Sequence, residues 1–186
     1  GYAYEVIKNF SVSATFKYLF SDMGRIGNSR GASSVAFDLG VLYKCEINDW
    51  EGAGWSVGLH VSNLGPKINY LTSKDALPAT VKVGGAADLP FLQMHKLTLT
   101  ADLGYRLSPA DVQALSVSAG AEYAWRELVM LRGGYHCGDK KKGDASYATA
   151  GAGVEYAGVR LDFAWLFAGH EYLARNTFWV SLGYSF

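Results

Sequence analysis

The feature that most constrains the fold is an alternation of apolar and polar residues that returns along the whole chain. From Phe10 to Phe20 every second residue is apolar, and Ser11, Ser13, Thr15 and Lys17 lie between them. A period of two over about ten residues is typical of a β-strand with one apolar face. This length also suits a tilted strand that crosses a bilayer. The alternation therefore predicts long strands with two chemically different faces.

The pattern recurs often enough to account for nearly the whole sequence. We expect strands over residues 1–7, 10–20, 35–43, 54–64, 80–89, 95–105, 115–125, 129–137, 147–157, 159–168 and 177–186. No segment has convincing helical periodicity, and no apolar run reaches the roughly 20 residues that a transmembrane helix needs. The sequence thus predicts an all-β chain of eleven strands in a single domain, residues 1–186.

The charges help to decide which medium the apolar face meets. Lys plus Arg and Asp plus Glu number 17 each, so no basic field favours a nucleic-acid partner. The apolar positions carry no charge, and a charge facing hydrocarbon at mid-membrane would cost roughly 2–4 kcal/mol. The polar positions carry Lys17, Asp38, His60, Lys82, Lys96, Asp102, Glu122, Arg132, His136, Glu155, Arg160 and Asp162.

Aromatic residues and the final residue point the same way. Aromatic side chains on the apolar face gather towards the strand ends, as in the girdles at membrane interfaces. The chain closes on Phe186, which resembles the C-terminal signal of outer-membrane barrels. A soluble β-sandwich or lipocalin-like barrel is the alternative, but eleven strands would supply too much apolar face for one small interior. We therefore expect a transmembrane antiparallel up-and-down β-barrel with its apolar face towards lipid.

Loop lengths predict the orientation of this barrel. Short links near 8–9, 126–128 and 157–158 alternate with longer polar segments, which are 21–33, 65–79, 106–114, 138–146 and 169–176. Outer-membrane barrels have short periplasmic turns and longer external loops, so the C-terminus is expected in the periplasm. A closed antiparallel barrel needs an even number of strands, so we expect an odd number of strands before Gly1.

Candidate chemical sites are few. Asp102, Glu122, Glu155 and Asp162 allow an acid/base set, but pairing with Lys82, Lys96, Arg132 and Arg160 along a lumen is the simpler interpretation. The four histidines lack metal-ligand spacing, and Cys45 and Cys137 are expected as free thiols at opposite rims. A lipid-modifying enzyme would need a Ser, a His and a carboxylate near the outer rim, and the sequence suggests no such set. We expect no enzyme, metal or cofactor.

Several segments carry a resemblance to a known family. They are Val61-Ser-Asn-Leu-Gly-Pro-Lys-Ile-Asn-Tyr70, Leu77-Pro-Ala-Thr-Val-Lys-Val-Gly84, His95-Lys-Leu-Thr-Leu-Thr-Ala-Asp102 and Asn176-Thr-Phe-Trp-Val-Ser-Leu-Gly-Tyr-Ser-Phe186. Their succession resembles the C-terminal half of the PorV family of the type IX secretion system in Bacteroidetes. The related PorQ proteins share this outline but match the closing segment less well.

The resemblance implies a fold and a function. It implies a fourteen-stranded FadL-like barrel with three strands missing, and an outer-membrane shuttle that takes C-terminal-domain cargo from the translocon barrel. The shuttle delivers this cargo to an attachment complex with a PorU-type sortase, in contact with outer-membrane lipid and lipopolysaccharide. Cargo binding falls to external loops, where Tyr70, Leu71, Tyr172 and Leu173 are the candidate contacts. A FadL-type channel for hydrophobic small molecules is the alternative.

Overall fold

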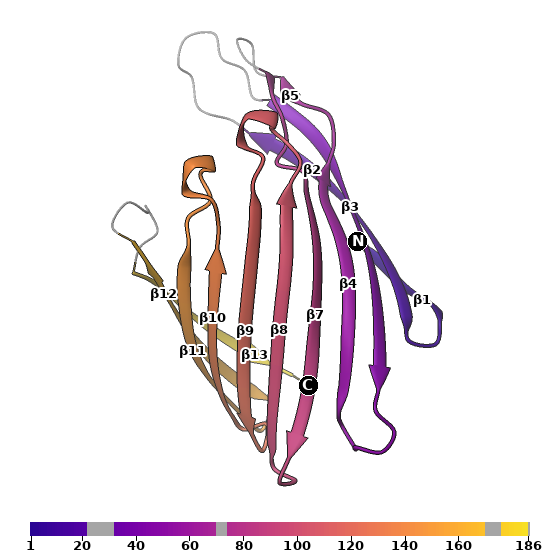
Figure 1. The fold of residues 1–186 in the computed structure, drawn as a ribbon, viewed down its shortest axis with the longest axis vertical. Coiled ribbons are helices and arrows are strands. Elements are labelled where there is room, and N and C mark those ends of the chain that lie inside the picture. The colour runs from indigo at the N-terminus through magenta and orange to yellow at the C-terminus, as the bar shows by residue number, and fades with distance from the viewer. Residues whose placement is uncertain (22–31, 70–73, 170–175, 186) are drawn as a thin grey trace.

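One strongly curved antiparallel sheet makes up most of the protein. The computed structural model describes residues 1–21, 32–69, 74–169 and 176–185. Its main sheet has eleven strands in the order β1-β2-β3-β4-β7-β8-β9-β10-β11-β12-β13, so every main strand pairs with its neighbours in sequence (Figure 1). No helix within the described segments has the length and hydropathy needed to span a bilayer.

The strands match the sequence prediction closely. They are β1 Tyr2–Ile7, β2 Phe10–Ser21, β3 Ala32–Glu46, β4 Gly54–Leu64, β7 Thr80–Phe91, β8 His95–Arg106, β9 Leu115–Trp125, β10 Val129–Cys137, β11 Tyr147–Tyr156, β12 Val159–Ala168 and β13 Thr177–Tyr184. All eleven predicted strands are confirmed. The largest difference is β3, which extends beyond 35–43 at both ends, because Ala32, Ser33 and Ser34 continue the ladder opposite β2 and residues 44–46 continue it opposite β4.

Four short elements were not predicted. Strands β5 (Ile68–Asn69) and β6 (Lys74–Asp75) form a separate hairpin within the segment 65–79. Two 3₁₀ turns, η1 (Ala110–Val112) and η2 (Lys140–Lys142), lie in the segments 106–114 and 138–146. Elements of two or three residues are too short to produce a hydrophobic period, so the alternation carries no signal for them.

The register separates the two faces of the sheet. Residues paired across strands have their side chains on the same face, and the pairs Phe16↔Phe37 and Leu103↔Val117 belong to the apolar face. Among the described residues no large side chain is fully buried, and the buried apolar set consists mainly of small residues. The apolar face is therefore exposed rather than packed into an interior, as expected for a lipid-facing wall and contrary to a soluble sandwich.

The hairpin connections sort by length to opposite ends of the sheet. The short turns after β1, β7, β9 and β11 lie at one end together with the turn after β3, whereas β5 and the two 3₁₀ turns of the longer connections lie at the other (Figure 1). We call these the short-turn end and the long-loop end. The prediction that short and long links alternate is confirmed.

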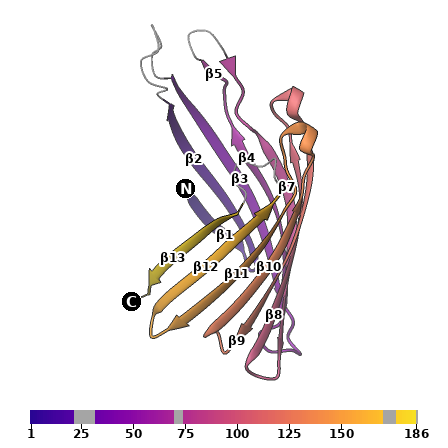
Figure 2. The same cartoon turned by 90° about the vertical axis from the view of Figure 1, so that its left-hand side faces the viewer.

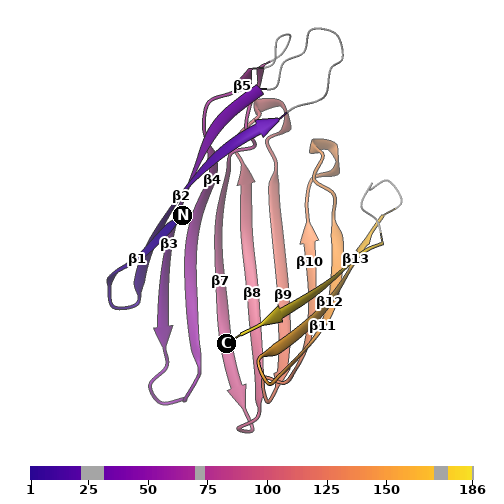
Figure 3. The ribbon, with the colours of Figure 1, turned by 180° about the vertical axis from the view of Figure 1, so that it is seen from behind.

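The sheet curves like a barrel wall but is not closed. Figure 2 shows the wall bending so that both edge strands, β1 and β13, come to the same side. Figure 3 shows β12 and β13 strongly inclined to β7 and β8, as the twist of a large sheet requires. Strands β1 and β13 do not pair with each other. An antiparallel up-and-down sheet of eleven strands is thus established, without closure.

Candidate functional site

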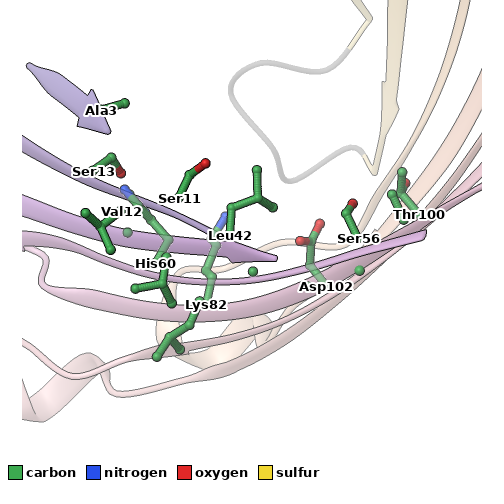
Figure 4. A pocket seen from close by; sticks show the side chains of 17 residues that line it. Ala3, Ser11, Val12, Ser13, Leu42, Ser56, His60, Lys82, Thr100 and Asp102 are labelled. Atoms are coloured by element: carbon green, nitrogen blue, oxygen red, sulfur yellow. The ribbon is translucent and has the colours of Figure 1, made fainter. Parts of the chain in front are cut away.

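The concave face of the sheet forms a groove near its middle. This inner groove has a volume of about 690 Å³, and on the concave side it is lined by the side chains of Ser11, Ser13, Leu42, Ser56, His60, Lys82, Thr100 and Asp102 (Figure 4). Glycines on three of the strands have no side chain that would fill this groove. At Gly84 an added Cβ would lie 2.3 Å from Asp102 Oδ1, so only glycine fits there without a shift. The polar face predicted from the alternation is therefore the concave one.

Two charged groups of the inner groove do not pair as expected. None of the ion pairs found between described residues includes Lys82 or Asp102. Lys82 pairs in register with Gly104, and Asp102 pairs with Gly84, so the two charges stand on different rows of the sheet. Pairing of Lys82 or Asp102 within the lumen was thus a wrong prediction, because register places them diagonally.

Apart from Lys96, the remaining predicted lumen charges form a network. Arg132 binds Glu122 and also Asp162, the latter at 2.5 Å from Nη1 to Oδ1. Arg160 binds Asp162 at 2.7 Å and Glu155 at 3.7 Å. Three of the four carboxylates considered for acid/base chemistry are therefore held by arginines, which confirms mutual pairing for this part of the wall.

Two further ion pairs differ in their surroundings. Lys17 lies 2.6 Å from Asp38, whose other oxygen accepts from the backbone N–H of Asn63 at 2.8 Å. Asp38 is buried, and this contact holds the bulge between β3 and β4. Lys96 lies 3.1 Å from Asp88, and both side chains are about 40% exposed. The first pair anchors the start of segment 65–79, and the second is a surface contact.

The segments at the long-loop end are tied to one another. Leu107 donates its backbone N–H to Ala79 O at 2.8 Å, which joins segments 65–79 and 106–114. Arg106 Nη1 donates to Lys142 O and Lys142 Nζ donates to Asp111 O, both at 3.2 Å, which joins 106–114 to 138–146. The candidate cargo contacts Tyr70, Leu71, Tyr172 and Leu173 lie outside the described residues.

One convergence of reactive groups was missed by the sequence analysis. Ser118 Oγ on β9 lies 2.9 Å from His136 Nδ1 on β10, and His136 Nε2 lies 3.0 Å from Asp144 Oδ1 in segment 138–146. The sequence therefore failed to show a Ser, His and carboxylate set near the rim that the structure brings together. Only the cross-strand register and the path of the loop unite these residues, and no spacing motif signals them.

Metal and thiol chemistry find no support within the described segments. No group of three or more His, Cys, Asp or Glu there is placed to hold a metal ion. Cys45 and Cys137 are free, as predicted. Cys45 pairs in register with Trp55 near the short-turn end and Cys137 with Val117 near the long-loop end, so the thiols lie at opposite rims.

Comparison with known protein families identifies a match. The family model described as type IX secretion system protein PorV matches residues 1–113, which is more than half of the 186 residues. This is a family of secretion-system components rather than a known enzyme family. No curated protein matches the chain.

Proposed function

Because this chain belongs to the PorV family of type IX secretion system proteins, we propose that it is an outer-membrane shuttle for secreted cargo. It binds the C-terminal domain of cargo that leaves the translocon barrel. It then delivers this cargo to the attachment complex that contains a PorU-type sortase. The shuttle role needs no chemical step from this chain, and the family match is the observation that carries the proposal.

The chemistry of the convex face supports placement in the outer membrane. In register, the residues of this face on the described strands include no Asp, Glu, Lys or Arg. Large side chains on it are strongly exposed, among them Leu103 at 46% and Leu131 at 55%. Water would disfavour so much exposed apolar surface, whereas hydrocarbon accommodates it and penalises charge.

The edge strands support closure by further strands. An unpaired strand edge cannot face hydrocarbon, because its N–H and C=O groups would lack partners. With eleven alternating strands, β1 and β13 run in the same direction, so antiparallel closure requires an odd number of additional strands. Three such strands complete a fourteen-stranded FadL-like barrel. In this arrangement β13 ends at the short-turn end, and the C-terminus is periplasmic.

Cargo binding is assigned to the long-loop end. The described residues of segments 65–79 and 138–146 lie at that end, where emerging cargo would meet them. The described parts of the two are tied together through segment 106–114, as shown by the hydrogen bonds of Leu107 and Lys142. Ordered loops lose less conformational entropy on binding. The apolar anchors of this surface are Tyr70, Leu71, Tyr172 and Leu173.

Affinity purification from native outer membranes tests the proposal. An affinity-tagged chain should recover a very large translocon barrel and proteins with the cargo C-terminal domain, and it should also recover the sortase complex. Recovery of the protein alone with bound fatty acid would instead support a FadL-type channel and overturn the shuttle.

A further inference from the structure

Ser118, His136 and Asp144 form a continuous hydrogen-bonded chain on the concave wall near the long-loop end. The distances are 2.9 Å from Ser118 Oγ to His136 Nδ1 and 3.0 Å from His136 Nε2 to Asp144 Oδ1. Ser118 and His136 are cross-strand partners on β9 and β10, so the sheet itself sets the first contact. The Tyr147 ring stacks on the imidazole with 4.8 Å between ring centroids and fixes its plane.

The chain of contacts sets the proton positions. The Asp144 carboxylate can only accept, so the imidazole N–H is held at Nε2. The Nδ1 lone pair is then free to accept the hydroxyl proton of Ser118. A serine with an adjacent base, oriented in turn by a carboxylate, is the arrangement that activates a hydroxyl for nucleophilic attack.

Small residues and hydroxyl groups surround Ser118 on the inner face. Three inner-face neighbours of Ser118 are glycines, namely Gly104 on β8, Gly120 on β9 and Gly134 on β10. Asp102, the other cross-strand partner of Ser118, comes within 2.3 Å of the Cβ position of Gly84, so its carboxylate leans away towards β7. Asp102 also lines the inner groove, which therefore reaches the strand beside Ser118 (Figure 4).

A cation lies on the same side. The Lys82 side chain extends over β8, with Cγ and Cε at 3.5 and 3.7 Å from the Cβ position of Gly104. Gly104 pairs with Ser116, the next inner-face residue to Ser118. Lys82 takes part in none of the ion pairs between described residues. An ammonium group without a counter-ion stabilises negative charge that develops on a carbonyl oxygen.

We propose that Ser118 is the nucleophile of an acyl-transfer site that hydrolyses carboxylic esters, a chemical activity separate from cargo transport. Ser118 Oγ attacks the ester carbonyl carbon while its proton passes to His136 Nδ1. The bond from the carbonyl carbon to the alcohol oxygen breaks, and the alcohol leaves with that proton. Water then attacks the acyl-serine, gives a proton to His136, and releases the carboxylic acid as Ser118 recovers its hydrogen.

The position of Ser118 also restricts the substrate. Strand β9 begins with Leu115 at the long-loop end, and Ser118 follows three residues later. An ester therefore enters from the long-loop end. The ammonium group of Lys82 favours esters that carry an additional anionic group.

Covalent labelling of the full chain in detergent tests the site. An alkyl fluorophosphonate should label the wild-type protein at Ser118, and Ser118→Ala should abolish the label. Ser116→Ala is the matched control, because Ser116 shares the face and strand but is not the partner of His136; its labelling should equal wild type. His136→Ala should slow both labelling and hydrolysis of p-nitrophenyl butyrate at least about 100-fold.

The role of Asp144 and the folded state need separate readouts. Asp144→Ala should slow labelling, and Asp144→Glu should restore much of the rate because it returns a carboxylate. If Asp144 only packed the loop, its carboxylate would not matter for the labelling rate. Ser118→Cys keeps the side-chain size and should react with iodoacetamide faster than the Ser118→Cys/His136→Ala double variant. Equal labelling of wild type and Ser118→Ala, no labelling of the folded wild type, or equal thiol rates in the cysteine pair would overturn the proposal.

Discussion

Arg132 binds Asp162 although their strands are not neighbours. Nη1 of Arg132 on β10 donates to Oδ1 of Asp162 on β12 at 2.5 Å, and β11 lies between the two strands. Gly153 on β11 makes this contact possible, because a Cβ there would lie 2.5 Å from Asp162 Oδ1 and 3.2 Å from Arg132 Nη1. The ion pair thus crosses directly over a glycine and braces three strands of the wall.

Replacement of Gly153 by alanine should disturb this brace. We expect Gly153→Ala to lower the free energy of unfolding by about 1–3 kcal/mol, since the new Cβ displaces the two charges. Gly133→Ala is the control, because a Cβ at Gly133 meets nothing within 4 Å, and it should change stability by less than about 0.5 kcal/mol. Urea titration of the refolded protein in lipid vesicles, followed by tryptophan fluorescence, measures both. Equal effects of the two substitutions would contradict the brace.

The two isolated ion pairs should differ in their contribution to stability. Removal of the buried Asp38 carboxylate leaves the Asn63 N–H without its acceptor, while the partly exposed Lys17 keeps Asn63 Oδ1, so Asp38→Ala should cost about 1–3 kcal/mol. The exposed pair of Asp88 and Lys96 should contribute less than about 1 kcal/mol, so Asp88→Ala should have a small effect. The same urea titration compares them, and a larger loss for Asp88→Ala would show that burial does not govern these pairs.

A charge placed on either face of β8 tests the membrane assignment. Leu99 faces outward in the middle of the strand, and Thr100 beside it faces inward. Leu99→Arg should cost roughly 2–4 kcal/mol in a bilayer and reduce the folded, heat-modifiable form in outer-membrane fractions. Thr100→Arg should leave that form nearly unchanged, because the concave side already carries charge. Normal assembly of Leu99→Arg would argue against lipid at this face.

The proposed cargo contacts can be compared with an exposed apolar residue at the short-turn end. The double substitution Tyr172→Ala/Leu173→Ala should reduce recovery of cargo about tenfold, since truncating an interface anchor costs upwards of about 1 kcal/mol. Leu92→Ala is the matched control, because Leu92 is 78% exposed on the turn between β7 and β8 at the short-turn end. Quantitative mass spectrometry of the purified complexes gives the ratio. Loss of cargo with Leu92→Ala alone would move the binding surface to the other rim.

The sequence by itself determined the strands and their faces. Successive side chains of a strand point to opposite sides, so the alternation around Phe16 and Leu99 records locally which residues lie on the apolar convex face and which line the concave wall. The number of strands, the long and short connections and the absence of charge from the outer face all follow from this period. The family resemblance also rests on contiguous segments and was confirmed over residues 1–113.

Only the tertiary structure decided which polar groups meet. Whether Lys82 faces Asp102 or Gly104 depends on strand register, and Arg132 reaches Asp162 only because Gly153 lies between them. Ser118, His136 and Asp144 come together through a cross-strand pair and the return of segment 138–146. Such contacts join residues distant in sequence, and they depend on the register between strands. The alternation cannot specify that register, because a shift of two residues leaves every side chain on the same face.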